Sequence, residues 1–503
     1  MIRKLLIAFL FLLLVLVASC SLFLPERFAI NVPLASMLLG RTADAPSAEQ
    51  IDNRFQVPEG FSVSIYAEGL GNARWMKVTG SGDILLTRPR TGDVVLVKAD
   101  ADGDGRSDAI VPLLEGLNKP HGVELNDGWL YIGETDAIGR IRFDEATGTV
   151  SGELDRIISG LPGGGNHWTK NLGFGPDGLL YLSIGSTCNV CIEKDERRAA
   201  MMRFAPNGSG GEIVARGLRN SVGFDWQPGT DKLFATDNGR DLLGDDYPPC
   251  ELNEVNMGSF YGWPYANGDN HPDPDFGEGQ AERIASSTPP AFDFNAHNAP
   301  LGMQFIKHNR VPAPLHNAAL VALHGSWNRT SKDGYKVVSL AWQPDGSIVE
   351  KDFLTGFEVD DDVVGRPVHV VEAADGSFYI SDDYSGTIWR VAYGEAQETI
   401  VVNTPIAEQA PLSGIPAAER AALALRGQAL YLEHKCAVCH DAAQAVPGVA
   451  VKELNQLRGR FDLGTLEALL TTPPPPMPIF PLSAEDKRAL SVYLLSEDRQ
   501  VEH

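Results

Sequence analysis

Short apolar or alternating runs recur through residues 55–391, and a Gly or Asp turn introduces most of them. The runs begin close to Gly82, Asp127, Asp177, Asp231, Leu320 and Asp375. Most of these starts lie roughly 45 to 57 residues apart, with one longer interval before the fifth. Short strands with turn signals, repeated six times, predict a six-bladed β-propeller over residues 55–394.

Other repeat folds fit this pattern less well. A β-sandwich needs fewer strands, and a helical solenoid would show a 3.6-residue apolar period instead of Gly and Asp punctuation. Propellers place their sites at the mouth of the central channel, on loops between strands. Polar residues in the loops between the apolar runs are therefore the first candidates for a site.

The pattern changes after Tyr393. Residues 395–416 have the composition of a linker, and strongly helical sequence begins at Ala417. A capped first turn at Ser483 opens a further amphipathic segment. We therefore predict a mainly β protein with a small all-α domain over residues 417–498.

The helical segment carries a Cys-x-x-Cys-His string. Cys436 and Cys439 lie one helical turn apart, and His440 follows directly, a spacing typical of covalent haem c attachment with histidine ligation of iron. Met477, held among prolines, is the candidate for the second axial ligand. A zinc site would need two further close ligands, and only His434 is near. The segment is thus predicted to be a class I-type cytochrome c.

The N-terminus is typical of an exported chain. Two basic residues precede an apolar run that leads to Cys20, a pattern that resembles a bacterial lipoprotein signal with Cys20 acylated. An uncleaved transmembrane anchor stays open, because the apolar stretch is about 20 residues long. Residues 1–24 are expected to be this segment and 25–54 a tether, which predicts a membrane-tethered protein of the bacterial periplasm, where haem c is also attached.

Composition limits the partners. The 503 residues are 43% hydrophobic, enough for more than one core, and the formal charge is −24. Such an acidic chain is not expected to bind nucleic acid through a basic face.

The remaining cysteines suggest one local crosslink. Cys188 and Cys191 form a second Cys-x-x-Cys, but Ile192 follows, so this is not a haem motif. In an oxidising compartment a disulfide is the default, while a redox or metal role stays open. Cys250 has no assigned partner.

An acidic turn is a candidate structural Ca²⁺ site. Asp100, Asp102, Asp104 and Asp108 alternate around Gly105, and carboxylates in such a turn suit Ca²⁺. The glutamate that closes an EF-hand loop is absent, so a solvated Asp/Gly turn is the alternative.

A series of loop motifs occurs in a specific order. They are Gly165-Asn166-His167-Trp168, Gly217-Leu218-Arg219-Asn220-Ser221, Asp237-Asn238-Gly239-Arg240, Glu251-Leu252-Asn253-Glu254, Tyr261-Gly262-Trp263-Pro264, His297-Asn298-Ala299-Pro300, His324-Gly325-Ser326-Trp327 and Gly365-Arg366-Pro367. Together they resemble the glucose/sorbosone dehydrogenase family, and its sorbosone-dehydrogenase-like branch in particular. That resemblance implies a six-bladed propeller that uses pyrroloquinoline quinone (PQQ) with Ca²⁺.

The resemblance implies roles for individual residues. His167 matches the base that takes the sugar hydroxyl proton as hydride leaves for the quinone. Arg219 matches the cation over the quinone carbonyl, and Asn220 and Arg366 match cofactor contacts. A second family arginine is Val368 here.

Further cofactor contacts are implied around the channel. Ca²⁺ would be bound by the backbone carbonyls of Gly239 and Arg240, and would act as a Lewis acid. His121, His297 and His324 are expected to line the PQQ pocket.

One position departs from the family. After the Ile184-Gly185 pair, the best-known members carry an aspartate that supports the base histidine, whereas this chain has Ser186. The group that orients His167 is therefore expected to lie elsewhere.

These observations lead to one hypothesis with two alternatives. The propeller oxidises an aldose or related sugar aldehyde at PQQ, and the fused haem passes electrons to a respiratory acceptor. A Ca²⁺-dependent propeller lactonase is the first alternative, which the haem motif disfavours. A non-catalytic docking propeller with a haem relay is the second.

Overall fold

The computed structural model describes residues 43–394, 415, 417–440, 454, 457, 463–471, 473, 477–478 and 480–496. Its contacts divide the chain into two compact units, Met1–Ala396 and Gln397–His503. The expected signal segment with Cys20, the first part of the tether and nearly all of the linker lie outside the described residues. Within the described ranges, no helix is both long and apolar enough to cross a membrane.

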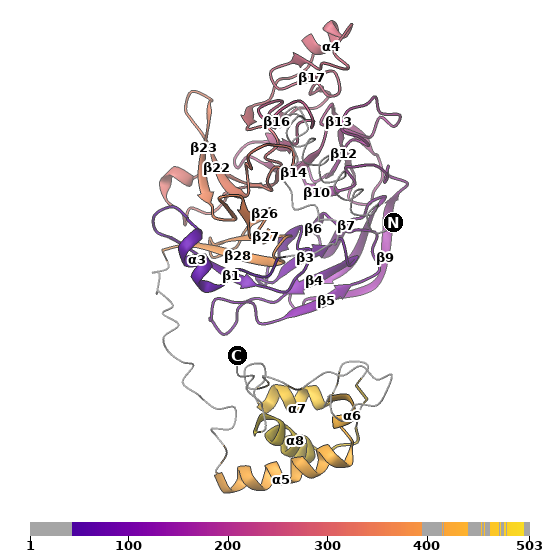
Figure 1. The fold of residues 1–503 in the computed structure, drawn as a ribbon. Coiled ribbons are helices and arrows are strands. Elements are labelled where there is room, and N and C mark those ends of the chain that lie inside the picture. The colour runs from indigo at the N-terminus through magenta and orange to yellow at the C-terminus, as the bar shows by residue number, and fades with distance from the viewer. Residues whose placement is uncertain are drawn as a thin grey trace, which may run out of the picture. The chain divides into compact units, whose positions relative to one another are not determined.

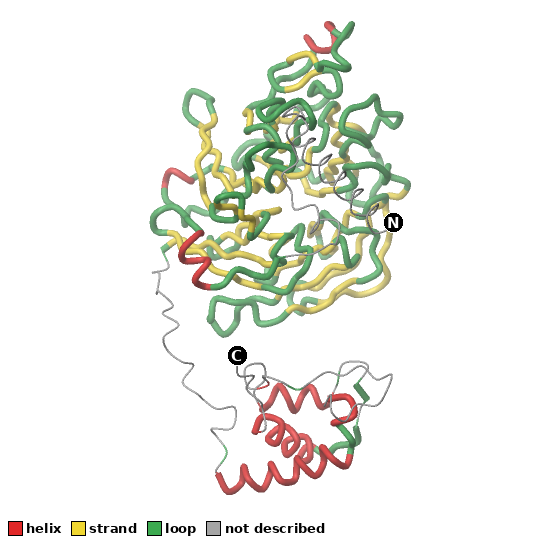
Figure 2. Tube along the Cα trace, viewed as in Figure 1, coloured by secondary structure: helices red, strands yellow, loops and turns green. Residues whose placement is uncertain are grey.

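Six four-stranded antiparallel sheets make up the first unit (Figures 1 and 2). The first three blades are β2 (Met76–Val78), β3 (Ile84–Arg88), β4 (Asp93–Val97) and β5 (Ile110–Leu114); β6 (Val123–Asn126), β7 (Trp129–Gly133), β8 (Ala137–Asp144) and β9 (Thr149–Ser159); and β10 (Lys170–Phe174), β11 (Leu180–Ile184), β12 (Ala200–Phe204) and β13 (Glu212–Arg216). The next two are β14 (Ser221–Trp226), β15 (Leu233–Asp237), β16 (Cys250–Val255) and β19 (Phe292–Phe294); and β20 (Pro300–Phe305), β21 (Ala319–Leu323), β22 (Lys336–Trp342) and β23 (Ile348–Leu354). The sixth combines β26 (Pro367–Glu372), β27 (Phe378–Asp382) and β28 (Thr387–Tyr393) with β1 (Phe61–Ala67).

The blades close into a ring, which confirms the predicted six-bladed propeller. The innermost strands β2, β6, β10, β14, β20 and β26 each contact the next around the channel. The N-terminal strand β1 supplies the outer strand of the last blade, with Phe61 opposite Tyr393. This pairing joins the two ends of the propeller sequence and covers the outer edge of β28.

The longer interval before the fifth repeat is an excursion between β16 and β19. It holds a short hairpin of β17 (Ala266–Asn267) and β18 (His271–Pro272), followed by α4 (Ala281–Ala285). A second small hairpin, β24 (Glu358–Val359) with β25 (Asp362–Val363), and a 3₁₀ turn, η2 (Ala313–Leu315), complete the loops.

The glycines at the turns between strands have a direct structural cause. Gly92 ends the β3–β4 turn with φ of 73°, and a Cβ there would lie 2.7 Å from the Leu117 carbonyl oxygen. Only glycine fits such a left-handed, crowded position without strain. Between blades, the apolar runs pack as aromatic clusters, for example Phe55 and Phe357 against the fully buried Trp389.

Residues 43–54 belong to the propeller unit, which differs from the predicted tether. Ser47 caps α3 (Ala48–Arg54) in a reciprocal capping box with Gln50, and Ile51 packs on the apolar cluster of the last blade. The capping box satisfies two end groups of the helix, which stabilises this short element against the blade.

The second unit is helical. It contains α5 (Ala417–Glu433), α6 (Ala437–His440), α7 (Leu463–Thr471) and α8 (Ala484–Ser496). Helices α5 and α8 pack together around Gly427, where an added Cβ would collide with the Ala489 carbonyl oxygen. Leu466, Val492 and Leu495 form its small core.

Candidate functional site

A cavity of about 430 Å³ opens among loops that lead into the innermost strands. Its lining comprises Asn72, Arg74, Pro89, Arg90, Lys119, Asn166, His167, Trp168, Thr169, Asn220, Val222, Leu301 and Asp383. Five of the six blades contribute a residue from just before or within their innermost strand, and the sixth contributes Asp383 from the turn between β27 and β28. The cavity thus lies at the channel mouth, where the fold predicts a site. Its volume falls in the range of roughly 300–1,000 Å³ common for small-molecule pockets.

His167 is held in one tautomer by Ser186. Its Nδ1 lies 2.8 Å from Ser186 Oγ and 3.1 Å from the Ser186 carbonyl oxygen. The Ser186 hydroxyl donates to the Cys188 carbonyl oxygen at 2.7 Å, so its oxygen is left to accept. Since both Ser186 atoms accept, Nδ1 carries the proton and Nε2 keeps its lone pair. Ser186 occupies the position of the family aspartate, and it is the group that orients His167.

The surroundings of His167 keep the ring neutral. Burial lowers its pKa to about 3, and the nearby guanidinium groups of Arg219 and Arg198 contribute to the decrease. Arg198 is itself buried and donates to the carbonyl oxygens of His167 and Gly185 at 3.2 and 3.1 Å. A Cβ at Gly185 would lie 2.5 Å from the Cβ of His167, so glycine is needed there. An unprotonated imidazole is the form that a general base requires.

A second histidine, His324, lies beside the cavity in a series of hydrogen bonds between charged side chains. Arg366 donates to His324 Nδ1 at 2.8 Å, and His324 Nε2 donates to Asp383 at 2.9 Å. Asp383 lines the cavity and accepts from Arg74 at 2.8 Å. Burial lowers the pKa of His324 to about 4, and the Arg366 charge adds to this. Arg366 thus reaches the cavity through His324 and Asp383.

Arg219 is the centre of a separate cluster. Its guanidinium donates to the carbonyl oxygens of Asn189, Asn238 and Gly239 at 2.9 Å each, and to the side chains of Asn189 and Asp241. Arg219 is absent from the described lining of the cavity. The Gly239 carbonyl proposed as a Ca²⁺ ligand accepts a hydrogen bond from Arg219.

The side chain of Arg240 points into the excursion after β16. It pairs with Asp273 at 2.6 Å and with Asp275 at 2.8 Å. Because a guanidinium is positively charged and has only donors, the backbone carbonyl is the one group of Arg240 that could bind a metal.

Two carboxyl groups, a buried one from Asp237 and a partly buried one from Glu251, face each other beside this cluster. Asp237 and Glu251 are paired across β15 and β16 and line a small cavity together with Arg219, Asn238 and Gly239. Burial raises the pKa of both carboxyls, and the charge of Asp237 raises that of Glu251 further. Two oxygen-rich side chains near backbone carbonyls suit a hard divalent cation. Sequence reasoning missed this pair, although Asp237 and Glu251 each begin a motif of the family series.

The other two histidines lie outside the cavity lining. His121 is fully buried against Trp75 and Trp168, and burial lowers its pKa well below the ordinary value. His297 Nε2 donates to the Gly244 carbonyl oxygen at 2.8 Å, and its Nδ1 lies 3.9 Å from Asp241. His297 therefore belongs to the Arg219 cluster, and His121 to the packed interior of the channel.

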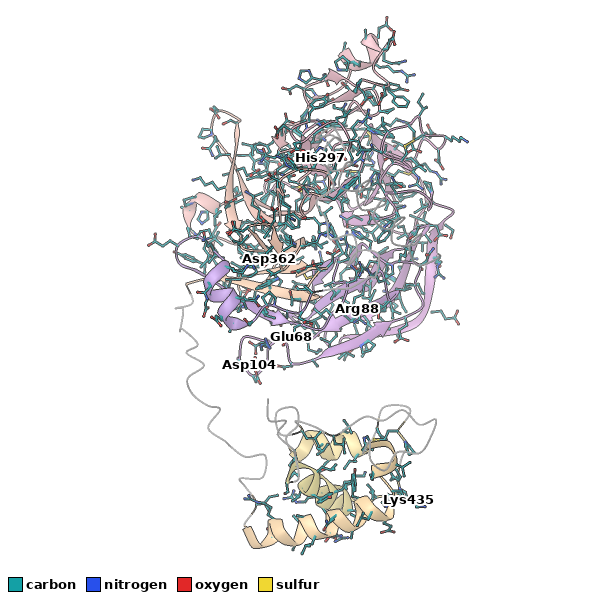
Figure 3. All side chains as sticks on the ribbon, viewed as in Figure 1. Glu68, Arg88, Asp104, His297, Asp362 and Lys435 are labelled. Atoms are coloured by element: carbon teal, nitrogen blue, oxygen red, sulfur yellow. A yellow bond between two sulfur atoms is a disulfide. The ribbon has the colours of Figure 1, made fainter. Side chains whose placement is uncertain are left out.

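The acidic turn brings three of its four aspartates together. Asp100, Asp102 and Asp108 have carboxylate oxygens within 4.8 Å of one another, whereas Asp104 accepts from the Arg106 backbone amide. Figure 3 shows Asp104 at the outer edge of the propeller, well separated from His297. The carboxylate of Asp100 also accepts from the amides of Gly103, Asp104 and Gly105. The turn is therefore held by hydrogen bonds between its own side chains and backbone.

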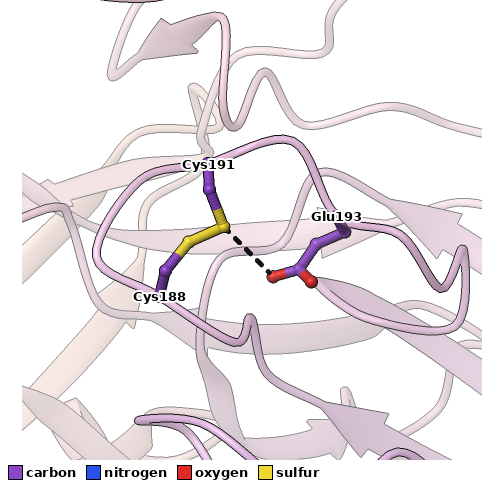
Figure 4. Close-up of side chains that lie close together, drawn as sticks. All are labelled: Cys188, Cys191 and Glu193. Carbon is purple, nitrogen blue, oxygen red and sulfur yellow. Dashed lines mark hydrogen bonds between the residues drawn. A yellow bond between two sulfur atoms is a disulfide. The ribbon is translucent and has the colours of Figure 1, made fainter.

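Cys188 and Cys191 form the expected disulfide (Figure 4). Cys191 Sγ lies 3.9 Å from Glu193 Oε1. The Glu193 carboxylate accepts from the Thr187 amide at 2.5 Å and from its hydroxyl at 2.8 Å. Because both sulfurs are bonded to each other and Glu193 is engaged, this group is a structural crosslink and not a metal site. Cys250 is buried in a blade core.

The haem motif follows α5, with Cys436 in the intervening turn and Cys439 and His440 in α6. His440 N donates to the Cys436 carbonyl oxygen at 3.1 Å, which places these residues on one helical turn. The side chain of Cys439 lies outside the described residues, and Met477 is described as half-buried.

Fold and site together define a six-bladed β-propeller with a candidate acid–base centre at its channel mouth. The chain belongs to the TrAA12-like family, whose model matches residues 55–256 and 280–394. The unmatched stretch between these ranges falls in the excursion after β16.

Curated proteins include relatives of this chain. An uncharacterised protein of Borreliella burgdorferi is 31% identical over 362 residues, covering 69% of this chain and 93% of that protein. A PQQ-dependent pyranose dehydrogenase of Coprinopsis cinerea is 26% identical over 419 residues, covering 69% of this chain and 56% of that protein. The match therefore spans only about half the length of the Coprinopsis enzyme.

Solved structures share the propeller fold. The calcium structure of a Trichoderma reesei family AA12 protein has a TM-score of 0.60 at 20% identity, covering 68% of this chain and 97% of that one. The holo PQQ domain of the Coprinopsis cinerea pyranose dehydrogenase gives 0.58 at 22% identity, covering 69% and 99%. The PQQ-bound aldose sugar dehydrogenase of Streptomyces coelicolor gives 0.50 at 20% identity, covering 67% and 99%. The resemblance to PQQ-dependent sugar dehydrogenases is thus confirmed, while the sorbosone-like branch and the haem fusion stay predictions.

Proposed function

We propose that this protein is a PQQ-dependent sugar dehydrogenase that passes electrons to its own haem c. The observation that carries the proposal is the neutral, tautomer-fixed His167 at a propeller cavity. The names of the Coprinopsis and Streptomyces relatives support PQQ as cofactor and a sugar as substrate.

The cavity residues fit an anionic, polar cofactor. Arg74, Arg90 and Lys119 bring three cations to the lining of a protein whose overall charge is −24. Buried polar atoms of Arg74 (Nε) and Asn220 (Oδ1) have no hydrogen-bond partner among the described residues. Unpartnered buried polar atoms are uncommon in native proteins and mark positions where a ligand or water completes the bonding. Arg74, Lys119 and Asn220 would therefore hold PQQ, with Arg366 supporting the network through His324.

The reaction uses His167 as a base. PQQ, when bound, supplies a two-electron acceptor for the hydride of the sugar. Nε2 of His167 takes the proton of the hydroxyl on the carbon that is oxidised, while Ser186 keeps Nδ1–H pointed away. Cofactor carboxylates in the cavity would offset the charges of Arg219 and Arg198, and so raise the pKa of His167 toward its ordinary value.

Ca²⁺ would be held near the Arg219 cluster. The candidate ligands are the carbonyls of Gly239 and Arg240, with the carboxyl pair Asp237 and Glu251 close by. The cation would favour the ionised forms of both carboxyls. The turn Asp100–Asp108 is a second, structural candidate.

The second unit would complete the electron path. Cys436 and Cys439 would attach haem c, and His440 and Met477 would ligate its iron, giving a one-electron carrier. Fusion raises the effective concentration of this acceptor near the propeller. The proposal includes a periplasmic location with an N-terminal membrane anchor or lipid at Cys20, and a respiratory protein or quinone as the final acceptor.

The test uses the full chain loaded with PQQ and Ca²⁺, assayed with an artificial electron acceptor over a panel of aldoses, keto-aldoses and lactones. We expect oxidation of at least one sugar and loss of turnover in His167→Ala with PQQ binding retained. Hydrolysis of a lactone without electron transfer would favour the lactonase alternative. Cofactor binding with no turnover of any substrate would favour a docking module.

A further inference from the structure

The disulfide Cys188–Cys191 lies in the loop of residues 186–191, which bonds both to His167, the proposed base, and to Arg219, whose charge lowers the pKa of that base. On one side, the Cys188 carbonyl oxygen accepts the Ser186 hydroxyl proton at 2.7 Å, which leaves the Ser186 oxygen to accept from His167. The Ser186 amide donates to the Arg219 carbonyl oxygen at 2.8 Å. One short loop therefore fixes the base and touches the backbone of the buried arginine.

On the other side, the disulfide ring contains Asn189. Its carbonyl oxygen accepts from Arg219 Nε at 2.9 Å, and its side-chain oxygen accepts from Arg219 Nη2 at 2.8 Å. The same side chain pairs with the backbone of Asp241, accepting from its amide at 2.8 Å and donating to its carbonyl at 3.0 Å. Asn189 is thus the common partner of Arg219 and of the loop that follows Gly239.

The crosslink is poorly suited to a purely global role. A disulfide stabilises a fold mainly by closing a long loop in the unfolded chain, and this one joins residues only three apart. Its effect is therefore local: it limits the backbone conformations available to residues 188–191. Both cysteines are partly exposed, while Ser186 and Arg219 are buried, so a small thiol can reach the bond without opening the blade.

We propose that the Cys188–Cys191 disulfide is a positioning element for His167 and Arg219, and that its reduction lowers turnover reversibly. The inference rests on the proposed dehydrogenase function. In the reaction, a dithiol supplies two electrons and two protons; the S–S bond breaks, two thiols form on this chain, and the reductant becomes a disulfide. The freed loop loses the fixed Cys188 carbonyl and Asn189 acceptors, so the His167 ring and the Arg219 guanidinium gain alternative orientations.

The experiment compares the full chain, loaded with PQQ, Ca²⁺ and haem, before and after reduction by a dithiol that is then removed by anaerobic desalting. Desalting keeps the reagent out of the turnover assay, and the artificial acceptor of that assay takes up any electrons that the reagent has left on the haem or the quinone. We expect kcat to fall about tenfold, the effect of losing about one hydrogen bond that orients the base. The wild-type kcat should return on reoxidation. The acid limb of the kcat/KM profile should move to higher pH, because a looser, more hydrated His167 has a higher pKa.

Two variants sharpen the test. The double variant Cys188→Ser/Cys191→Ser should have the kcat and the pH profile of the reduced protein, and the dithiol should change neither. The control Cys250→Ala, which leaves the disulfide intact, should respond to the dithiol as the wild type does. A reduced protein or double variant with the wild-type kcat and pH profile would overturn the proposal.

A readout independent of turnover separates this inference from the proposed function. Hydrogen–deuterium exchange of the amides of Ser186 and Asn166, which donate to the carbonyl oxygens of Arg219 and Thr187, should rise on reduction. If no sugar is oxidised in any form, the dehydrogenase proposal fails. Unchanged exchange at these two amides would then overturn the positioning role as well.

Discussion

The hydroxyl of Ser186 offers the sharpest test of how the base is oriented. Ser186→Ala removes one acceptor of the His167 Nδ1–H, at 2.8 Å, and leaves the backbone carbonyl at 3.1 Å. A typical hydrogen bond contributes about 0.5–1.5 kcal/mol net, and 1.36 kcal/mol corresponds to tenfold in rate, so kcat should fall roughly 2- to 13-fold. Replacing His167 itself by Gln should cost about 10²- to 10⁴-fold, the usual contribution of a general base.

A carboxylate at position 186 should raise the pKa of His167. Ser186→Asp restores the residue expected from the family pattern and places an anion against Nδ1–H, which raises the pKa of His167. Because the neutral ring is the active form, kcat/KM rises with pH through that pKa. The acid limb of the profile should therefore move to higher pH than in the wild type.

The assay is steady-state turnover from pH 4 to 9 with an artificial acceptor, using protein saturated with PQQ and Ca²⁺. Thr187→Ala is the matched control: it removes a neighbouring hydroxyl that bonds to Glu193 and not to His167. Two results would show that Ser186 does not orient His167 in this way. One is an unshifted acid limb in Ser186→Asp, and the other is a loss in Ser186→Ala as large as in His167→Gln.

Three further predictions concern the cofactor, the metal and the helical unit. Arg74→Ala should weaken PQQ binding roughly 10- to 100-fold, since hydrogen bonds to charged groups are worth about 1.5–3 kcal/mol; an unchanged Kd by fluorescence titration would remove the cavity as the site. Burial raises the pKa of Asp237 to about 7 and that of Glu251 to about 8, so the folded state holds protons that the unfolded state releases between about pH 4 and those values, and stability should fall as pH rises through that window. Ca²⁺ bound to the ionised pair should abolish this fall in Tm, and a chelator should restore it; a Tm profile indifferent to Ca²⁺ would contradict the assignment. Gly427→Ala should destabilise the helical unit by about 1–3 kcal/mol, because the new methyl meets the Ala489 carbonyl, and calorimetry showing an unaltered transition would contradict this.

The propeller could be predicted from the sequence because its signals are local. Each repeat carries its own turn and apolar run, as at Gly82 and Asp127, and six such units specify the blade number. The closure of the last blade by β1 was not predictable, since Phe61 and Tyr393 pair across almost the whole propeller sequence. Similarly, α3 could not be predicted, because the helix has only 7 residues and its apolar face is the single residue Ile51.

The candidate site was predictable only in its separate motifs. His167 and Arg219 stand in recognisable loops, but the sequence could not show that Arg219 faces Asn189 and Gly239 while His167 faces the cavity. The chain from Arg366 through His324 to Asp383 joins three loops far apart in sequence, so only the fold reveals it. In the sequence, Ser186 shows only that the family aspartate is absent. A serine oxygen can accept from His167 here because its own proton is donated to the Cys188 carbonyl, and only the structure reveals that bond.

In the proposed electron path, electrons leave a sugar at the His167 cavity and arrive at the haem of Cys436, Cys439 and His440. The most direct test adds sugar to oxidised full-length protein, loaded with PQQ and Ca²⁺, and follows the haem α-band without any added acceptor. We expect sugar-dependent reduction of the haem in the wild type and none in His167→Gln. A haem that stays oxidised with every sugar, in protein with PQQ bound, would contradict it.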